Sequence, residues 1–293
     1  MFQFPCTITS TVRSREIGVA LRSVASQNYA NKLNAIYSKY NITADQFSCR
    51  CFEKCTEYAS KAKRPLDKNG AEAHIGSRYG ETLKIVVVSM DTGGDAFNIS
   101  DRTDQIENKS YKKETNKHMR GTRELLECLY HPYNPSKINL YMLFAMVNAV
   151  KCSGSDSSMK SLPKSVYINC FPYLKSEVLG LEPDLVVVQG HTVKSLFGGK
   201  HMHSLPSSLI QKAVATATAD KPMQRILVGI AEAYLMDLDM GQKNKVLTLF
   251  TPHPSTPNGS WQVFAQTAMY AVSILIDNIL ERRGYDIHRI LLS

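Results

Sequence analysis

The sequence predicts an α/β fold with a largely parallel central sheet. Runs of apolar, β-branched residues indicate strands buried on both faces at 83–90 (LKIVVVSM), 185–188 (LVVV) and 246–250 (VLTLF). A fourth strand, or a strand with a loop, is expected within 139–150 (NLYMLFAMVNAV). Helical segments separate these runs, which is the element order of parallel strands joined by helices. We therefore expect a three-layer α/β/α architecture around a mostly parallel, four-stranded sheet.

The segments between the strands carry helix and loop signals. Apolar residues at three- and four-residue steps predict helices within 12–62, and a broad apolar face predicts a long helix at 262–281. Shorter helices are expected at 123–129, 173–181 and 191–197. Loops are expected at 63–80, which holds proline and three glycines, and at the lysine-rich stretch 98–122. The stretch 200–224 is expected to be a polar linker with weak helix signals.

The composition excludes several classes of protein. Apolar residues make up 43% and charged residues 21% of the 293 residues, which excludes disordered and fibrous proteins. No apolar stretch approaches the ~20 residues of a membrane span, and the first residues lack the pattern of a secretory signal. We therefore expect a cytoplasmic protein with no membrane partner, in which the seven cysteines are thiols or metal ligands rather than disulfides.

The charge balance points to an acidic partner. The chain holds 35 Lys+Arg against 26 Asp+Glu, a formal net charge of +9. Such a modest excess suggests nucleic acid as the partner without establishing it.

The candidate site follows from the ends of the predicted strands. In open parallel sheets, ligands bind at the carboxyl ends of the strands. Here these ends are followed by DTGGD (91–95), by Asn148, by Gly190-His191 and by His253-Pro254-Ser255. Taken singly, each of these is more often a turn or a cap. Their occurrence at four successive strand ends is what predicts a site.

These four points, in this order, resemble the uracil-DNA glycosylase superfamily. The best-matching stretches are NAVKC (148–152), Cys170-Phe-Pro-Tyr-Leu174 with Glu177, and LEPDLVVVQG (181–190), and they are similar to the iron–sulfur-containing branches, families four and five. The match covers roughly residues 45–280. The first motif departs from the superfamily by Ser89 in place of Gly and Thr92 in place of Pro.

The resemblance implies a monofunctional DNA glycosylase. Such an enzyme flips a pyrimidine, uracil or a modified pyrimidine, out of DNA and hydrolyses its N-glycosidic bond, which leaves an abasic site. Asp91 would orient water or stabilise the sugar cation, and His253 would donate a hydrogen bond to O2 of the departing base. Asn148 would accept from N3–H and donate to O4 of uracil, or use the opposite pairing with cytosine.

Further contacts to the base and to DNA are expected around these residues. Phe97 is the candidate for stacking under the flipped base. His118 and Arg120 belong to the stretch 98–122, interpreted either as a solvated basic loop or as a lid that contacts DNA or the base. The expected DNA-contacting residues are Thr92, Gly93, Arg120, His191 and Ser255.

The resemblance also implies a structural metal centre. Cys152 and Cys170 lie where families four and five place two ligands of a 4Fe–4S cluster. The second pair is expected to be Cys51 and Cys55, which share one face of a helix, with Cys49 as a possible replacement for either. The same four thiolates would also suit tetrahedral zinc.

The expected organisation is a single, monomeric domain over 1–293, with no obligate protein partner. Its N-terminal helical segment, 1–62, would contribute cluster cysteines, and 83–281 would form the α/β core. Three alternatives remain at this stage. The first is an antiviral defence glycosylase that excises modified cytosine, such as glucosylated hydroxymethylcytosine, from phage DNA. The second is a non-catalytic nucleic-acid-binding protein with the same fold. The third is a zinc-stabilised interaction protein.

Overall fold

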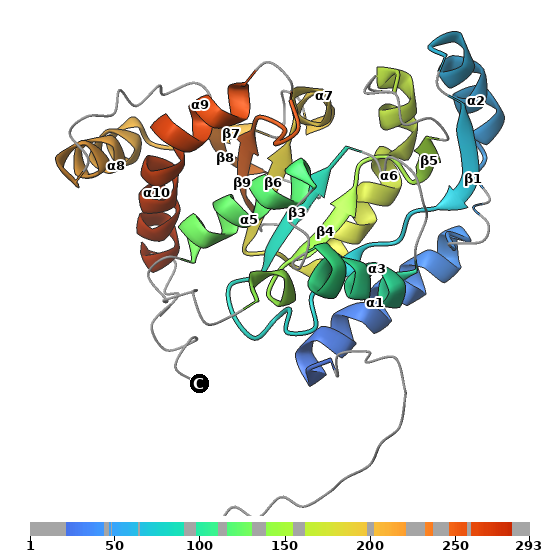
Figure 1. The fold of residues 1–293 in the computed structure, drawn as a ribbon, viewed down its shortest axis with the longest axis horizontal. Helices are drawn as coiled ribbons and strands as arrows, with labels where there is room; N and C mark the ends of the chain where they lie inside the picture. Colours follow the sequence, from blue (N-terminus) through green and yellow to red (C-terminus); the bar gives the residue numbers. More distant parts are fainter. Residues whose placement is uncertain are drawn as a thin grey trace, which may run out of the picture.

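One mixed sheet organises the protein. The computed structural model describes residues 22–43, 47, 49–63, 65–90, 98–110, 116–130, 139–154, 162–197, 202–220, 232–236, 246–256 and 259–282. Within these residues, seven strands form the sheet in the order β2-β4-β3-β6-β9-β8-β7 (Figure 1). Along the chain they are β2 (His74–Ile75), β3 (Ile85–Ser89), β4 (Ala145–Asn148), β6 (Leu185–Gln189), β7 (Met202–Ser204), β8 (Glu232–Met236) and β9 (Val246–Thr251).

The four strands predicted from the sequence form the parallel centre of this sheet. β4 pairs with β3, β3 with β6, and β6 with β9, all in parallel. The mostly parallel sheet is therefore confirmed, but the expected count of four strands is wrong. Among the described residues, β2, β7 and β8 add antiparallel pairings at the two edges. The sequence did not reveal β2 and β7 because they have only two and three residues, too few to show a period of two. The five residues of β8 lie in 226–238, where the sequence signal is ambiguous between helix and strand.

Each face of the sheet contributes to its own hydrophobic core. Val86 and Val88 of β3 belong to one cluster, and Ile85 and Val87 belong to the other. This division follows from the strand geometry, in which successive side chains point to opposite faces. All residues of β3 and β6 are buried, as expected for strands covered on both sides.

Helices supply the other half of each core. The first cluster includes residues of α1, α2, α3, α6, α7 and η5, and the second includes residues of η1, α5, η4, α8, α9 and α10. In Figure 1, α8, α9 and α10 lie to the left of the sheet, and α1 and α2 lie to its right. Their bounds are α1 (Val24–Tyr40), α2 (Phe52–Lys61), α3 (Ile99–Asp104), η1 (Gln105–Ser110), α5 (Lys117–Leu129), η4 (Leu140–Met142), α6 (Lys164–Leu181), α7 (His191–Lys194), η5 (Ser195–Phe197), α8 (Ser207–Asp220), α9 (Ser260–Thr267) and α10 (Met269–Arg282).

Three predicted loops contain regular structure. The stretch 98–122 holds α3, the π-helix η1 and the start of α5; 200–224 holds β7 and α8; and 63–80 holds β2 and a further strand, β1 (Leu66–Gly70). The single helix expected at 262–281 is two helices, α9 and α10, with a break at Ala268. No single helix among the described residues is long and apolar enough to cross a membrane; α9 and α10 reach that length only as a pair bent by 60°.

A separate two-stranded ribbon joins the N-terminal part of the chain to the segment that follows β4. β1 pairs antiparallel with β5 (Cys152–Gly154), and Gly70 lies opposite Cys152. Next to this pairing, the backbone N–H of Ala71 donates to the carbonyl of Lys151 at 2.7 Å. The ribbon thereby places Cys152 beside the segment that carries α2.

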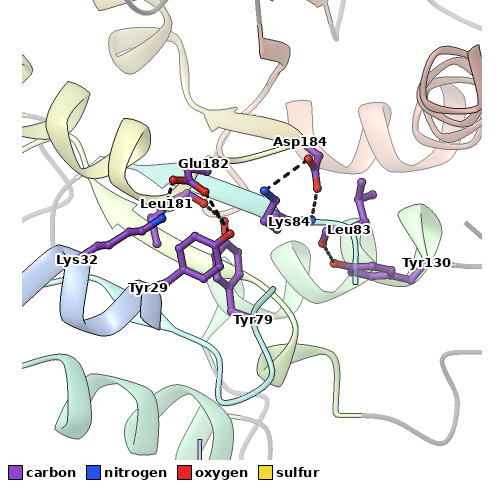
Figure 2. Close-up of polar contacts among 9 residues, drawn as sticks. All are labelled: Tyr29, Lys32, Tyr79, Leu83, Lys84, Tyr130, Leu181, Glu182 and Asp184. Carbon is purple, nitrogen blue, oxygen red and sulfur yellow. Dashed lines mark hydrogen bonds and ion pairs between the residues drawn. The ribbon is translucent and has the colours of Figure 1, made fainter. Parts of the chain in front are cut away.

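The opposite end of the sheet is held by side chains that bridge helices and strand starts (Figure 2). Tyr79 Oη donates to the carbonyl of Leu181 at 2.9 Å, and the backbone N–H of Lys84 donates to Asp184 at 2.9 Å. Lys32 of α1 pairs with Glu182 at 2.5 Å. These contacts join α1, the end of α6 and the starts of β3 and β6 at the amino ends of the strands.

A buried ion pair lies under the carboxyl end of β4. Lys151 Nζ contacts Glu177 of α6, and both side chains are fully buried. Glu177 also accepts a hydrogen bond from Tyr37 Oη at 2.7 Å, and Tyr37 Oη accepts from the backbone N–H of Ala73 at 2.8 Å. This network links α1, α6 and the segment that directly follows Asn148.

Removing one partner of this pair is expected to destabilise the protein strongly. Lys151→Met should lower the free energy of unfolding by about 3–5 kcal/mol, because it leaves the carboxylate of Glu177 buried without a counter-charge. The double variant Lys151→Met/Glu177→Gln should recover most of that loss, since it removes both charges at nearly constant volume. Urea unfolding of the three proteins measures both values. A double variant no more stable than Lys151→Met would contradict the explanation.

Candidate active site

The ends of the four parallel strands bring Asn148 and the segments that carry His191 and His253 to one edge of the sheet. Ser89, the last residue of β3, lies opposite Asn148, the last residue of β4. Gln189 at the end of β6 lies opposite Thr251 at the end of β9, two residues before His253. Parallel pairing therefore places three segments side by side at this edge: Asn148, the turn that follows β6 (Gly190-His191, called the β6 turn below) and His253-Pro254-Ser255.

The first turn of α5 packs over this row through His118. Asn116 caps the helix by accepting hydrogen bonds from the backbone N–H groups of His118 and Met119. His118 Nε2 lies 2.7 Å from Gln189 Oε1 and 3.1 Å from Ser89 Oγ. Because an amide oxygen only accepts, Nε2 of His118 carries a proton. One imidazole thus spans the ends of β3 and β6.

His253 stacks on His118 and is held as a neutral donor. The two rings lie 4.7 Å apart at an angle of 12°. The backbone N–H of Ser255 donates to Nδ1 of His253 at 3.2 Å, so the ring proton is on Nε2. Burial lowers the pKa of His253 to about 4, which keeps the ring uncharged at neutral pH. The remaining group of this imidazole is an Nε2–H donor.

Two glycines lie next to the His-Pro-Ser segment. Gly190 has φ +103°, a conformation that other residues rarely adopt, and this backbone conformation rather than a lack of space requires glycine there. Gly121 of α5 faces Pro254 so closely that an added Cβ would lie 2.6 Å from Pro254 Cβ. The His-Pro-Ser segment therefore packs between α5 and the β6 turn.

Asn148 is buried, and only half of its amide is paired. The residue is 1% exposed, and its Oδ1 accepts a hydrogen bond of 2.7 Å from Arg102 Nη2. Its Nδ2 is buried and has no hydrogen-bond partner among the described residues. A buried amide donor without a partner is uncommon in folded proteins and is a natural point for ligand contact.

The remaining predicted site residues divide into two groups. Arg120, His191 and Ser255 are exposed: Arg120 lies on α5, His191 begins α7, and Ser255 follows the strand-end histidine. Asp91, Thr92, Gly93 and Phe97 lie outside the described residues, so their predicted roles stay predictions. Asp91 follows Met90 directly in the sequence.

Cysteines from three segments meet beside the β1–β5 ribbon. Burial raises the pKa of Cys170 to about 12, and the charges of Cys49 and Cys55 raise it further. The pKa of Cys152 is also raised, first by burial and then by Cys170, Cys49 and Cys55. Cys49, Cys55, Cys152 and Cys170 therefore lie within electrostatic reach of one another. All four are thiols rather than disulfides.

Cys49 takes part in more of these interactions than Cys51, which was the expected ligand. Cys49 Sγ accepts from Tyr173 Oη at 3.5 Å and from the backbone N–H of Cys51 at 3.4 Å. Cys51 is the N-cap residue of α2 and makes no side-chain cap, and its charge raises the pKa of Cys55. Among the described residues, no three His, Cys, Asp or Glu side chains form a group that could hold a single metal ion.

The donor chemistry of Cys49, Cys55, Cys152 and Cys170 is that of a group that binds thiolates, although the described side chains are not gathered into a metal site. Thiols with raised pKa values are costly to ionise in the metal-free protein, and a bound cation would reverse that cost by pairing with the thiolates. The set consists of sulfur donors drawn from separate elements, which is the donor chemistry of iron–sulfur and structural zinc sites. Its position connects α2, β5 and α6.

Three residues of the site were not among the predicted site residues. His118 falls in 98–122, a stretch without periodicity that predicts a basic loop or lid rather than a helix that begins after Asn116. Gln189 ends the apolar run of β6, and nothing in the sequence distinguishes it from other strand-end residues. Arg102 had no signal in the sequence, because its contact with Asn148 depends on how α3 packs against β2 and β4.

Comparisons with known proteins add no family to this picture. No protein-family model matches the chain, and no curated protein sequence matches it.

The protonation state of His253 can be measured directly. In an NMR titration of imidazole nitrogens, His253 should stay neutral with its proton on Nε2 as the pH falls from 7 to 5, and should take up a second proton near pH 4. Since the unfolded ring titrates near 6.5, the unfolded chain binds more protons between these values, and the folded state loses stability as the pH falls through that window. A folded-state pKa near 6.5 would contradict this account.

Proposed function

We propose that this protein is a monofunctional DNA glycosylase with the three-layer α/β/α architecture of uracil-DNA glycosylases. It would act in the cytoplasm as a monomer on DNA. It would flip a pyrimidine, uracil or a modified pyrimidine, out of the helix and hydrolyse the N-glycosidic bond, leaving an abasic site. The +9 net charge supports a nucleic-acid substrate.

One observation carries this proposal: a neutral imidazole is fixed as a hydrogen-bond donor at the carboxyl edge of the parallel strands. Cleavage of the N1–C1′ bond builds negative charge on O2 of the departing base. His253 offers Nε2–H to such an oxygen, with its orientation set by the Ser255 N–H and by the stacked ring of His118. A donor that is oriented before the reaction stabilises the developing charge without reorganisation.

The other steps use residues whose roles come from the sequence resemblance. Asp91, next in the chain after Met90, would accept a proton from the attacking water while the water oxygen bonds to C1′. The base would leave with the bonding electron pair and be protonated afterwards. Asn148 would hold the flipped base by its edge, and Phe97 would stack beneath it.

Hydrolysis by water, rather than by a lysine nucleophile, agrees with the environment of Lys151. This lysine is close to Asn148 in sequence, but its ammonium is fully buried and paired with Glu177. A Schiff base needs an amine that reaches the sugar. The Lys151 ammonium is instead held in the buried ion pair with Glu177, which supports a monofunctional enzyme.

We further propose that the cysteine cluster holds a structural 4Fe–4S centre, with zinc as the chemical alternative. Cys49, Cys55, Cys152 and Cys170 would be the ligands. Cys51, the ligand expected from helical spacing, would lie beside them. The centre would supply cross-links between α2, β5 and α6 rather than chemistry at the base.

The glycosylase activity is tested by scoring alkali-labile abasic sites. Duplexes with uracil and phage DNA with glucosylated hydroxymethylcytosine should be compared, because the antiviral alternative predicts cleavage of the second. His253→Ala should lower the single-turnover rate by roughly 10²–10³-fold, since the O2 donor is lost. Asp91→Asn should lower it by roughly 10²–10⁴-fold.

The matched control is His203→Ala, which removes an exposed histidine on the edge strand β7 and should leave the rate unchanged. Release of neither base by the wild-type protein would reject the glycosylase. Salt-sensitive DNA binding without any release would instead favour the non-catalytic binder, and absence of both would favour the interaction protein.

The metal centre has an independent spectroscopic test. Protein purified without oxygen should be brown, absorb visible light at about 400 nm and contain iron. Cys49→Ser should lose most of that iron, whereas Cys51→Ser, the matched control, should retain it. Iron loss in Cys51→Ser alone would restore the ligand set expected from the sequence. Colourless protein with bound zinc would establish the alternative metal, and protein without metal would reject the centre.

A further inference from the structure

Arg102 controls the orientation of the Asn148 amide. A guanidinium has only donors, so the atom of Asn148 that faces it has to be the oxygen, as observed at 2.7 Å. Rotating the amide by half a turn would set its NH2 group against the guanidinium, with two donors facing each other in a buried site. The NH2 group is therefore held away from Arg102.

Arg102 is itself held in place. Its Nη1 donates to the carbonyl of Glu72 at 2.9 Å, and the Glu72 carboxylate accepts from the backbone N–H of Ile99 at 2.8 Å, at the start of α3. The Arg102 residue is 6% exposed. Burial lowers the pKa of Arg102 to about 10, which leaves the guanidinium charged at neutral pH. The amide of Asn148 thus meets a fixed, charged donor.

We propose that Arg102 is the positioning residue that sets base selectivity, by making Asn148 a donor to the 4-position of the flipped pyrimidine. The site would then take a 4-oxo pyrimidine in preference to a 4-amino pyrimidine. This inference rests on the proposed glycosylase function and concerns how the site chooses among bases.

The direction of the selectivity follows from which atom of Asn148 is unpaired. The buried Nδ2 needs an acceptor, whereas Oδ1 already has Arg102. The 4-substituent projects furthest from the ring along the edge that Asn148 would read, so it is the group best able to reach a deeply buried donor. An O4 atom accepts from Nδ2. A 4-amino group would oppose it donor to donor.

The proposed contact of Asn148 with the 4-position does not recognise the substituent at the 5-position of the base. Uracil and thymine are alike at positions 3 and 4, so Arg102 and Asn148 do not distinguish them. The selectivity that they set is between oxo and amino pyrimidines, which is the distinction between the repair substrate and a modified cytosine.

The test is the ratio of single-turnover rates on two duplexes that place uracil or 5-hydroxymethylcytosine opposite the same abasic-site analogue, so that neither base is paired and both flip out at similar cost. The wild-type protein should release uracil faster. Arg102→Met, which keeps length but removes every donor, should shrink the ratio by roughly 10–100-fold because the amide is free to rotate. Arg102→Lys, which keeps a charged donor, should restore part of the ratio. Thermal melting shows whether each variant is folded.

A second measurement uses the unmodified chain and avoids any folding defect. Duplexes with uncleavable 2′-fluorinated nucleotides separate base binding from bond cleavage. The wild-type protein should bind the uracil analogue at least roughly tenfold more tightly than the cytosine analogue. Equal binding, or tighter binding of the cytosine analogue, overturns the inference.

The outcomes distinguish this inference from the function on which it rests. Absence of abasic sites with every base tested would reject the glycosylase. Release of bases with the same ratio in the wild type and in folded Arg102→Met would reject the role of Arg102 alone. Faster release of the 4-amino base by the wild type would reject the predicted direction.

Discussion

The ion pair between Lys151 and Glu177 is the constraint on which the arrangement of the site depends. It lies where the chain leaves β4, and it ties that exit to α6 while Tyr37 ties α6 to α1. A buried pair of this kind contributes less to stability than its Coulomb energy suggests, because both ions lose their hydration. The ion pair instead fixes the position of the segment that follows β4 relative to α6. Asn148 precedes Lys151 and Cys152 follows it directly, so the pair holds in place the segment that connects the two residues.

The donors at the strand ends share one physical strategy. His253 is oriented by a backbone N–H, His118 by an amide oxygen, and Asn148 by a guanidinium. The backbone N–H and the guanidinium can act only as donors, and the Gln189 amide is held by a second contact, in which its Nε2 donates to Thr122 Oγ1. The orientation of each polar group is therefore set before any ligand arrives, which is the condition for effective electrostatic stabilisation.

Structural elements could be predicted where burial requires a regular pattern of apolar residues. They could not be predicted where they depend on contacts between distant parts of the chain. The four central strands were predicted because strands covered on both faces need unbroken apolar runs, as in Val86 to Val88. β2 and β7 were missed because edge pairing of two or three residues leaves no periodic signal. The strand-end positions of Asn148 and His253 were predicted from the α/β pattern. Arg102 and His118 were not, because only the packing of α3 and α5 brings them to those ends. Helical spacing favours Cys51 as a ligand, and it does not evaluate Cys49, which lies before the first residue of α2.

The pairing of β9 beside β6 has a consequence for how the protein folds. The contacts that complete the site join residues far apart in the chain, such as His118 with Gln189 and Arg102 with Asn148. Contacts of this range form late, because the intervening chain has to be closed into a loop first. β9 is the last of the central strands along the chain, and it delivers His253. During synthesis, a chain whose first three central strands have already paired still lacks that donor, so the site matures only when the C-terminal segment docks.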